Sequence, residues 1–167
     1  MNKKVLMNKQ FSTKQVQQNL LKYEYDVIHL ATHGKFDINP ESNFILTFKE
    51  KLSVDALSHL LTIDKSDRKQ SMELLTLSAC ETARGSEESA FGLAGIAIRT
   101  GVKSSLASLW FVNDKSTSEL MTEFYKQWQT GLSKAQALRK AQILIIKKGK
   151  GIEVKHWAPF ILISNWM

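Results

Sequence analysis

The sequence of 167 residues contains one cysteine, Cys80, and its apolar runs all fall short of the roughly 18 residues that span a bilayer. A single cysteine excludes a disulfide within the chain and is typical of a reducing compartment. The apolar stretch near the N-terminus is too short for the hydrophobic region of a secretion signal. We therefore expect a cytoplasmic protein that does not enter a membrane.

Charge is distributed unevenly along the chain. The formal net charge is +7, with residues 1–25 at +4, residues 126–155 at +7 and residues 26–125 at −4. A basic protein raises the question of nucleic-acid binding. The sequence has no glycine-rich phosphate loop, no zinc-finger spacing and no aromatic RNA-binding signature. Specific nucleic-acid binding is therefore not expected, and the basic ends are interpreted as solvated surface.

Apolar runs and apolar residues at helical spacing predict strands that alternate with helices. Ser12 and Ser133 are each followed three residues later by glutamine, which is the spacing of a capping box. Either Asp114 or Ser116 is expected to cap a further helix. The pattern predicts an α/β fold with a mostly parallel sheet and helices on both faces. The expected strands are 27–32, 44–48, 74–78, 104–110 and 158–164, and the expected helices are 12–22, a short one after Ser53, 87–100, 114–129 and 133–147.

Two of the expected strands are followed by residues whose side chains could act in catalysis. His33 follows the strand over 27–32, and Cys80 follows the strand over 74–78. The carboxyl ends of parallel strands meet at one edge of a sheet, and neighbouring strands lie about 4.8 Å apart. An imidazole beside a thiol can accept its proton and produce the thiolate nucleophile. The two residues are 47 positions apart with the histidine first, and caspases have this order with about 50 residues between them.

Gly34 directly follows His33 and could contribute to the same site. Its backbone N–H and that of Cys80 could form an oxyanion hole for an acyl-transfer intermediate. The alternatives are an inert, buried Cys80 and a structural His33. We interpret His29 as a hydrogen-bonded core residue, and the two remaining histidines, His59 and His156, as structural. No metal site or cofactor is expected, because there is no second cysteine and no helical pair of ligands.

Six segments of the sequence resemble those of a known family. H-L-A-T-H-G, L-S-A-C-E-T-A, G-L-A-G, A-S-L-W-F-V-N-D, A-L-R-K-A-Q and H-W-A-P-F follow one another in this order. They resemble the CHAT domain, a caspase-like module often found beside TPR repeats in bacterial proteins. The resemblance covers residues 10–167 and leaves 1–9 as an N-terminal tail. It implies a caspase-hemoglobinase fold and a cysteine endopeptidase that cleaves a protein partner, with the family's histidine at His33 and its nucleophile at Cys80.

The sequence also departs from the family pattern. It resembles roughly the C-terminal half of a full CHAT domain, and we expect it to lack the N-terminal part. Phe111 replaces the family's usual proline, and Asn113 replaces a frequent aspartate. A sheet without its neighbouring strand exposes an edge that can pair with another chain. A non-catalytic interaction module, either a pseudoenzyme or a fragment that needs a partner, is therefore the alternative function, and a different cysteine hydrolase is a third.

Substrate preference depends on few residues. Asp114 follows a strand end, so its carboxylate could line the pocket for the residue before the scissile bond, where a basic side chain would gain a charge-assisted partner. Its alternative role is that of a helix N-cap. The net −4 of residues 26–125 also favours basic substrates. The expected partners are a protein or peptide substrate and a regulatory TPR-type protein or a second copy, with no membrane.

Overall fold

The computed structural model describes residues 3–36, 40–62, 71–78, 81–82, 100–110, 112–148 and 153–164. Cys80, Phe111 and residues 87–99 of the helix expected over 87–100 lie outside the described residues. Among the described residues, no helix is long and apolar enough to cross a bilayer.

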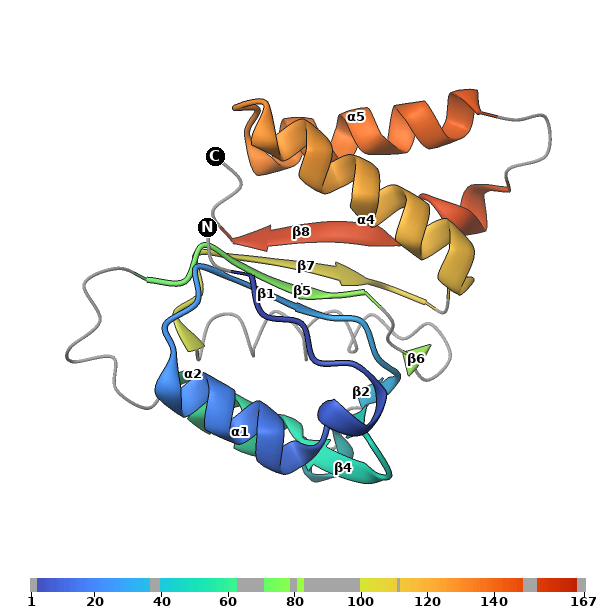
Figure 1. Ribbon diagram of the computed structural model, residues 1–167. Coiled ribbons are helices and arrows are strands. Elements are labelled where there is room, and N and C mark those ends of the chain that lie inside the picture. The colour runs from blue at the N-terminus through green and yellow to red at the C-terminus, as the bar shows by residue number, and fades with distance from the viewer. Residues whose placement is uncertain are drawn as a thin grey trace.

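The main sheet has four strands in the order β1-β5-β7-β8 (Figure 1). The first three run parallel, and only β8 is antiparallel to its neighbour. The mostly parallel sheet expected from the sequence is therefore confirmed. Its strands are β1 (Val27–Leu30), β5 (Leu74–Leu77), β7 (Ser104–Ser108) and β8 (Phe160–Ser164).

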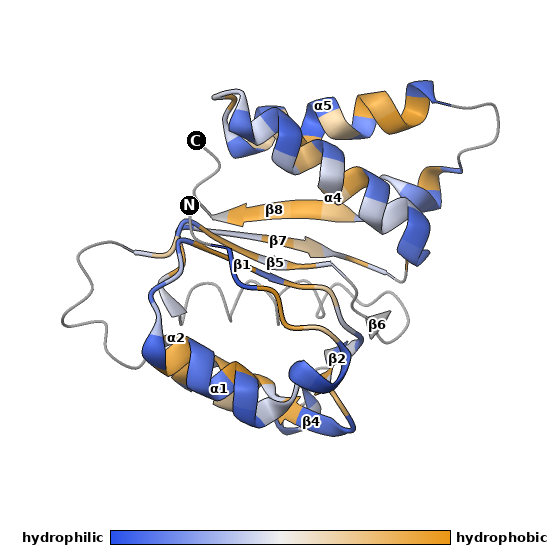
Figure 2. Cartoon of the chain, in the orientation of Figure 1, coloured by the Kyte–Doolittle hydropathy of each residue, from blue (hydrophilic) through white to orange (hydrophobic). Residues whose placement is uncertain are grey.

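Helices cover both faces of this sheet (Figure 1). Helices α4 (Asp114–Gln129) and α5 (Lys134–Lys147) lie on one face, and α1 (Thr13–Lys22) and α2 (Val54–Thr62) lie on the other. Neighbouring residues of a strand point to opposite faces, so Leu74 packs in the cluster of α4 and α5 while Leu75 packs in the cluster of α1 and α2. Figure 2 shows the hydrophobic residues along β8 and the hydrophilic surface of α1.

Local capping explains where the helices begin. The side chain of Ser12 accepts a hydrogen bond from the N–H of Gln15, and Ser133 forms the expected capping box with Gln136. The cap of α4 was predicted wrongly. Asn113 has a non-helical backbone, and its Oδ1 accepts from the N–H of Lys115 at 2.9 Å, so Asp114 is already the first helical residue. Both Asp114 and Ser116 lie inside the helix.

A second, smaller sheet has the order β4-β3-β2-β6 and lies at the far end of β1 and β5 (Figure 1). The sequence predicted only β3, over 44–48. The other strands are short, and the turn between β3 and β4 uses Lys49 at a positive φ of 63°. The strands of this sheet are β2 (Gly34–Phe36), β3 (Phe44–Thr47), β4 (Glu50–Ser53) and β6 (Glu81–Thr82). Among the described residues, the 3-10 turns are Asn8–Gln10, Pro40–Ser42 and Val154–His156.

The same two stretches of chain pair in parallel in both sheets. β1 pairs in parallel with β5 up to Leu30 and Leu77, and the N–H of Ser78 donates to the carbonyl of Leu30 at 3.2 Å. In the smaller sheet β2 again runs parallel to β6, with Lys35 opposite Glu81. Residues 31–33 therefore lie between two parallel pairings of the same two stretches of chain.

Candidate active site

A cleft of about 470 Å³ opens where β1 and β5 end. One helix face forms one of its walls, because the lining residues of α4 recur at the three- and four-residue spacing of a helix. The chain that follows β1 and β5 forms the facing wall. The described lining residues are His29, Ala31, Thr32, His33 and Ser78 on that side, and Asp114, Thr117, Ser118, Met121, Thr122 and Tyr125 on α4.

His33 is an exposed residue of this cleft. Its backbone is fixed by the smaller sheet, because its carbonyl accepts from the N–H of Leu46 at 2.7 Å. The hydroxyl of Thr32 donates to the carbonyl of Leu46 at 2.6 Å and holds the same turn. The local structure thus anchors the main chain on both sides of His33 and leaves the residue at the solvent-accessible surface of the cleft.

Gly34 begins β2 and is buried opposite Ile45. In an antiparallel pair, residues alternate between those that exchange hydrogen bonds and those whose N–H and C=O point away from the partner strand. His33 bonds to Leu46, so Gly34 belongs to the second kind. Its N–H therefore points away from β3, towards the side of β2 on which β6 pairs.

Cys80 lies outside the described residues, so the sequence-based pairing of His33 with Cys80 stays a prediction. Two residues close to it in the sequence are described: Ser78 lines the cleft, and Glu81 pairs with Lys35. The oxyanion hole of Gly34 and Cys80 is a prediction for the same reason.

His29 makes the best-defined contacts in the cleft. Its Nε2 is hydrogen-bonded to Oγ of Ser78 at 2.7 Å, and its ring centroid lies 5.7 Å from that of Tyr125. The Tyr125 hydroxyl in turn lies 3.0 Å from Oγ1 of Thr76. Surrounding protein atoms desolvate the imidazolium and lower the pKa of His29 to about 4, although the residue still reaches solvent. The expected hydrogen bond is confirmed, but His29 lines the cleft and is not a core residue.

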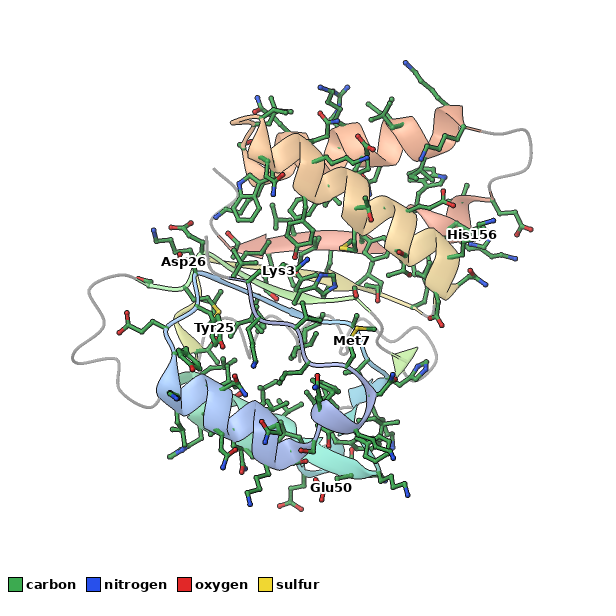
Figure 3. The ribbon with its side chains drawn as sticks, in the orientation of Figure 1. Lys3, Met7, Tyr25, Asp26, Glu50 and His156 are labelled. Carbon is green, nitrogen blue, oxygen red and sulfur yellow. The ribbon has the colours of Figure 1, made fainter. Side chains whose placement is uncertain are left out.

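Asp114 lies exposed at the first position of α4 and lines the cleft near the end of β1. Its alternative role as N-cap was wrong, because Asn113 has that role. His156 is hydrogen-bonded through Nδ1 to Oγ of Ser116 at 3.2 Å, beside the start of α4 (Figure 3). This contact agrees with the structural role expected for His156.

The sequence-based reasoning missed the hydroxyl-bearing residues of the cleft. Thr117, Ser118 and Thr122 share one face of α4 with Asp114, and their helical spacing is visible in the sequence. Ser78 was expected only as the end of a strand. Within the described residues, no group of three or more histidine, cysteine, aspartate or glutamate side chains could hold a metal ion.

Comparison with known families agrees with the six sequence segments. The family model described as CHAT domain matches residues 1–165. No curated protein shows a significant match to this chain. Because the family match covers nearly the whole sequence, the chain belongs to the CHAT domain family.

Proposed function

We propose that this chain is a cysteine endopeptidase of caspase-hemoglobinase fold that cleaves a protein partner, with Cys80 as nucleophile and His33 as general base. The observation that carries the proposal is the double parallel pairing, of Leu30 with Leu77 and of Lys35 with Glu81. Cys80 directly precedes Glu81, and His33 precedes Lys35 by two residues. This register supports a meeting of thiol and imidazole at the mouth of the cleft that His33 lines.

The chemistry follows from these two groups. The imidazole of His33 accepts the thiol proton, and the thiolate of Cys80 attacks the carbonyl carbon of the scissile peptide bond. The imidazolium then donates this proton to the leaving amine as the C–N bond breaks. Water, deprotonated by His33, hydrolyses the thioester, and Cys80 returns to its thiol form. General acid–base catalysis of this kind typically contributes a factor of about 10²–10⁴ to the rate.

The backbone supplies the second element of the mechanism. The N–H groups of Gly34 and Cys80 stabilise the oxyanion that forms when the thiolate attacks. The direction of the Gly34 N–H, away from β3 and towards the side of β6, supports this role. One such donor is typically worth about 2.7–4 kcal/mol of transition-state stabilisation.

Location and regulation belong to the proposal as well. A single cysteine fits a reducing, cytoplasmic compartment. The described strands leave one side of β1 without a paired strand in the main sheet, which supports control by a regulatory protein partner or a second copy.

Covalent labelling tests the proposed catalytic pair. The purified chain is treated with a peptidyl electrophile, and the labelled residue is identified by mass spectrometry. We expect wild type to be labelled at Cys80, Cys80→Ala to remain unlabelled, and His33→Ala to react about 10²-fold or more slowly. His59→Ala, which removes an exposed histidine of α2, is the matched control and should react like wild type. Equal labelling rates for wild type and His33→Ala, with both proteins folded by circular dichroism, would rule out His33 as the base.

A further inference from the structure

The face of α4 that lines the cleft has an outer and an inner row. Asp114, Ser118 and Thr122 follow one another at intervals of four residues, and all three are exposed. The inner row contains Thr117 and Met121, which are both buried. A side chain entering the cleft would therefore meet a carboxylate and two hydroxyls first, and Thr117 and Met121 further in.

Thr117 is the unusual member of this face. It is 7% exposed, and its Oγ1 has no hydrogen-bond partner among the described residues. Buried hydroxyls in native proteins are nearly always hydrogen-bonded, and an exception calls for an explanation. Because Thr117 also lines the cleft, a donor of a bound ligand is the partner that would satisfy it.

The charge of the cleft indicates what kind of donor this is. Among the described lining residues, Asp114 is the only carboxylate, and there is no lysine or arginine. The low pKa of His29 keeps its imidazole neutral at neutral pH. The N-terminal pole of α4 contributes a positive potential equivalent to about half a charge, which the full negative charge of Asp114 exceeds. The lining therefore favours a cationic group with several N–H donors.

We infer that this cleft is the specificity pocket for an arginine before the scissile bond, with its guanidinium bonded to the carboxylate of Asp114 and to the hydroxyl of Thr117. The inference rests on the proposed peptidase, because His33 lines the same cleft. Arginine fits better than lysine, since its planar guanidinium carries five donors and can bond several acceptors at once. Met121, about one helical turn beyond Thr117, offers apolar contact for its methylene chain.

Binding to an inactive chain tests the pocket separately from catalysis. The Cys80→Ala protein is titrated with two fluorescent peptides that differ only in arginine or citrulline at the position before the intended scissile bond. Citrulline keeps the shape of arginine and removes its charge. We expect the citrulline peptide to bind about 10–100-fold more weakly than the arginine peptide. This is the loss of affinity expected when a hydrogen bond to a charged group is removed. When Asp114→Asn is introduced into the Cys80→Ala protein, binding of the arginine peptide should weaken to a similar extent. Binding of the citrulline peptide should stay nearly unchanged.

Two further variants test Thr117, and one controls for charge. Thr117→Val keeps the shape of the side chain without its hydroxyl and should weaken arginine binding by about 5-fold, whereas Thr117→Ser should retain it. Glu119→Gln removes a carboxylate from the same helix outside the cleft lining and should bind like the parent.

The outcomes separate the pocket from the proposed activity. Equal binding of arginine and citrulline peptides, or equal arginine binding by the parent and Asp114→Asn, would overturn the inference. A failure of both peptides to bind would also overturn it. The Cys80→Ala protein could prefer the arginine peptide while the electrophile fails to label Cys80 in wild type. This result would support the arginine pocket and refute the proposed peptidase activity.

Discussion

Replacing His29 by glutamine tests the electrostatic environment of the cleft. Surrounding protein atoms partly desolvate the imidazole and lower the pKa of His29 from 6.5 to about 4 in the folded chain. Between these two values the unfolded chain binds the proton more readily than the folded one. The free energy of unfolding therefore falls as the pH falls from about 6.5 to about 4 and is fully restored above this range.

The expected size of this effect follows from the pKa and the exposure of the residue. At 1.36 kcal/mol for each pH unit, a histidine fully removed from water would change the free energy of unfolding by roughly 3 kcal/mol over this range. His29 is an exposed residue, and solvent screening reduces the expected change to about 1 kcal/mol.

Urea denaturation between pH 4.5 and pH 7 provides the assay. Glutamine does not titrate and can keep a hydrogen bond to Ser78, so the His29→Gln variant should lose about 1 kcal/mol less than wild type on acidification. His59→Gln is the matched control and should show the wild-type slope. The same pH dependence for wild type and His29→Gln would refute the reasoning about the cleft.

Three further predictions concern the fold. Asn113→Ala removes the cap of α4 and should lower the free energy of unfolding, measured by urea denaturation, by about 1 kcal/mol. Asn113→Asp should retain most of the stability of wild type, and an unchanged urea midpoint for Asn113→Ala would contradict the cap assignment. Phe124 is fully buried against Tyr125 and Trp128, so Phe124→Ala should lower the free energy of unfolding by about 3–5 kcal/mol and Phe124→Leu by clearly less. Equal losses for the two variants would argue against close packing around Phe124. Gly131 has a φ of +91° with no atom within 4 Å of an added Cβ, so Gly131→Ala should cost about 1 kcal/mol through backbone strain alone; a stabilised variant would contradict this.

The main sheet could be predicted from the sequence because its signals are local. Leu74–Leu77 and Ser104–Ser108 are short runs buried on both faces, and the caps at Ser12 and Ser133 depend only on residues three positions away. The choice among Asn113, Asp114 and Ser116 as cap could not be made this way. All three residue types suit an N-cap, and the backbone angles of Asn113 decide between them.

The smaller sheet and the cleft depend on contacts between distant parts of the chain. β2 and β6 have three and two residues, too few to show an alternating pattern, and their pairing is a tertiary contact. His33 and Asp114 could be identified as candidates because each follows an apolar strand. The unpartnered hydroxyl of Thr117 becomes visible only when α4 packs beside the sheet, and the hydrogen bond between His29 and Ser78 becomes visible only when β1 pairs with β5.

The measurement that tests the central claim most directly is the distance between Sγ of Cys80 and the nearer ring nitrogen of His33. A crystal structure of the unreacted wild-type chain would supply it. The account predicts either a direct separation of about 4 Å or less or a single water that bridges the two atoms, with the sulfur open to the cleft. A sulfur packed away from the cleft, or a separation well beyond the reach of one water, would contradict it.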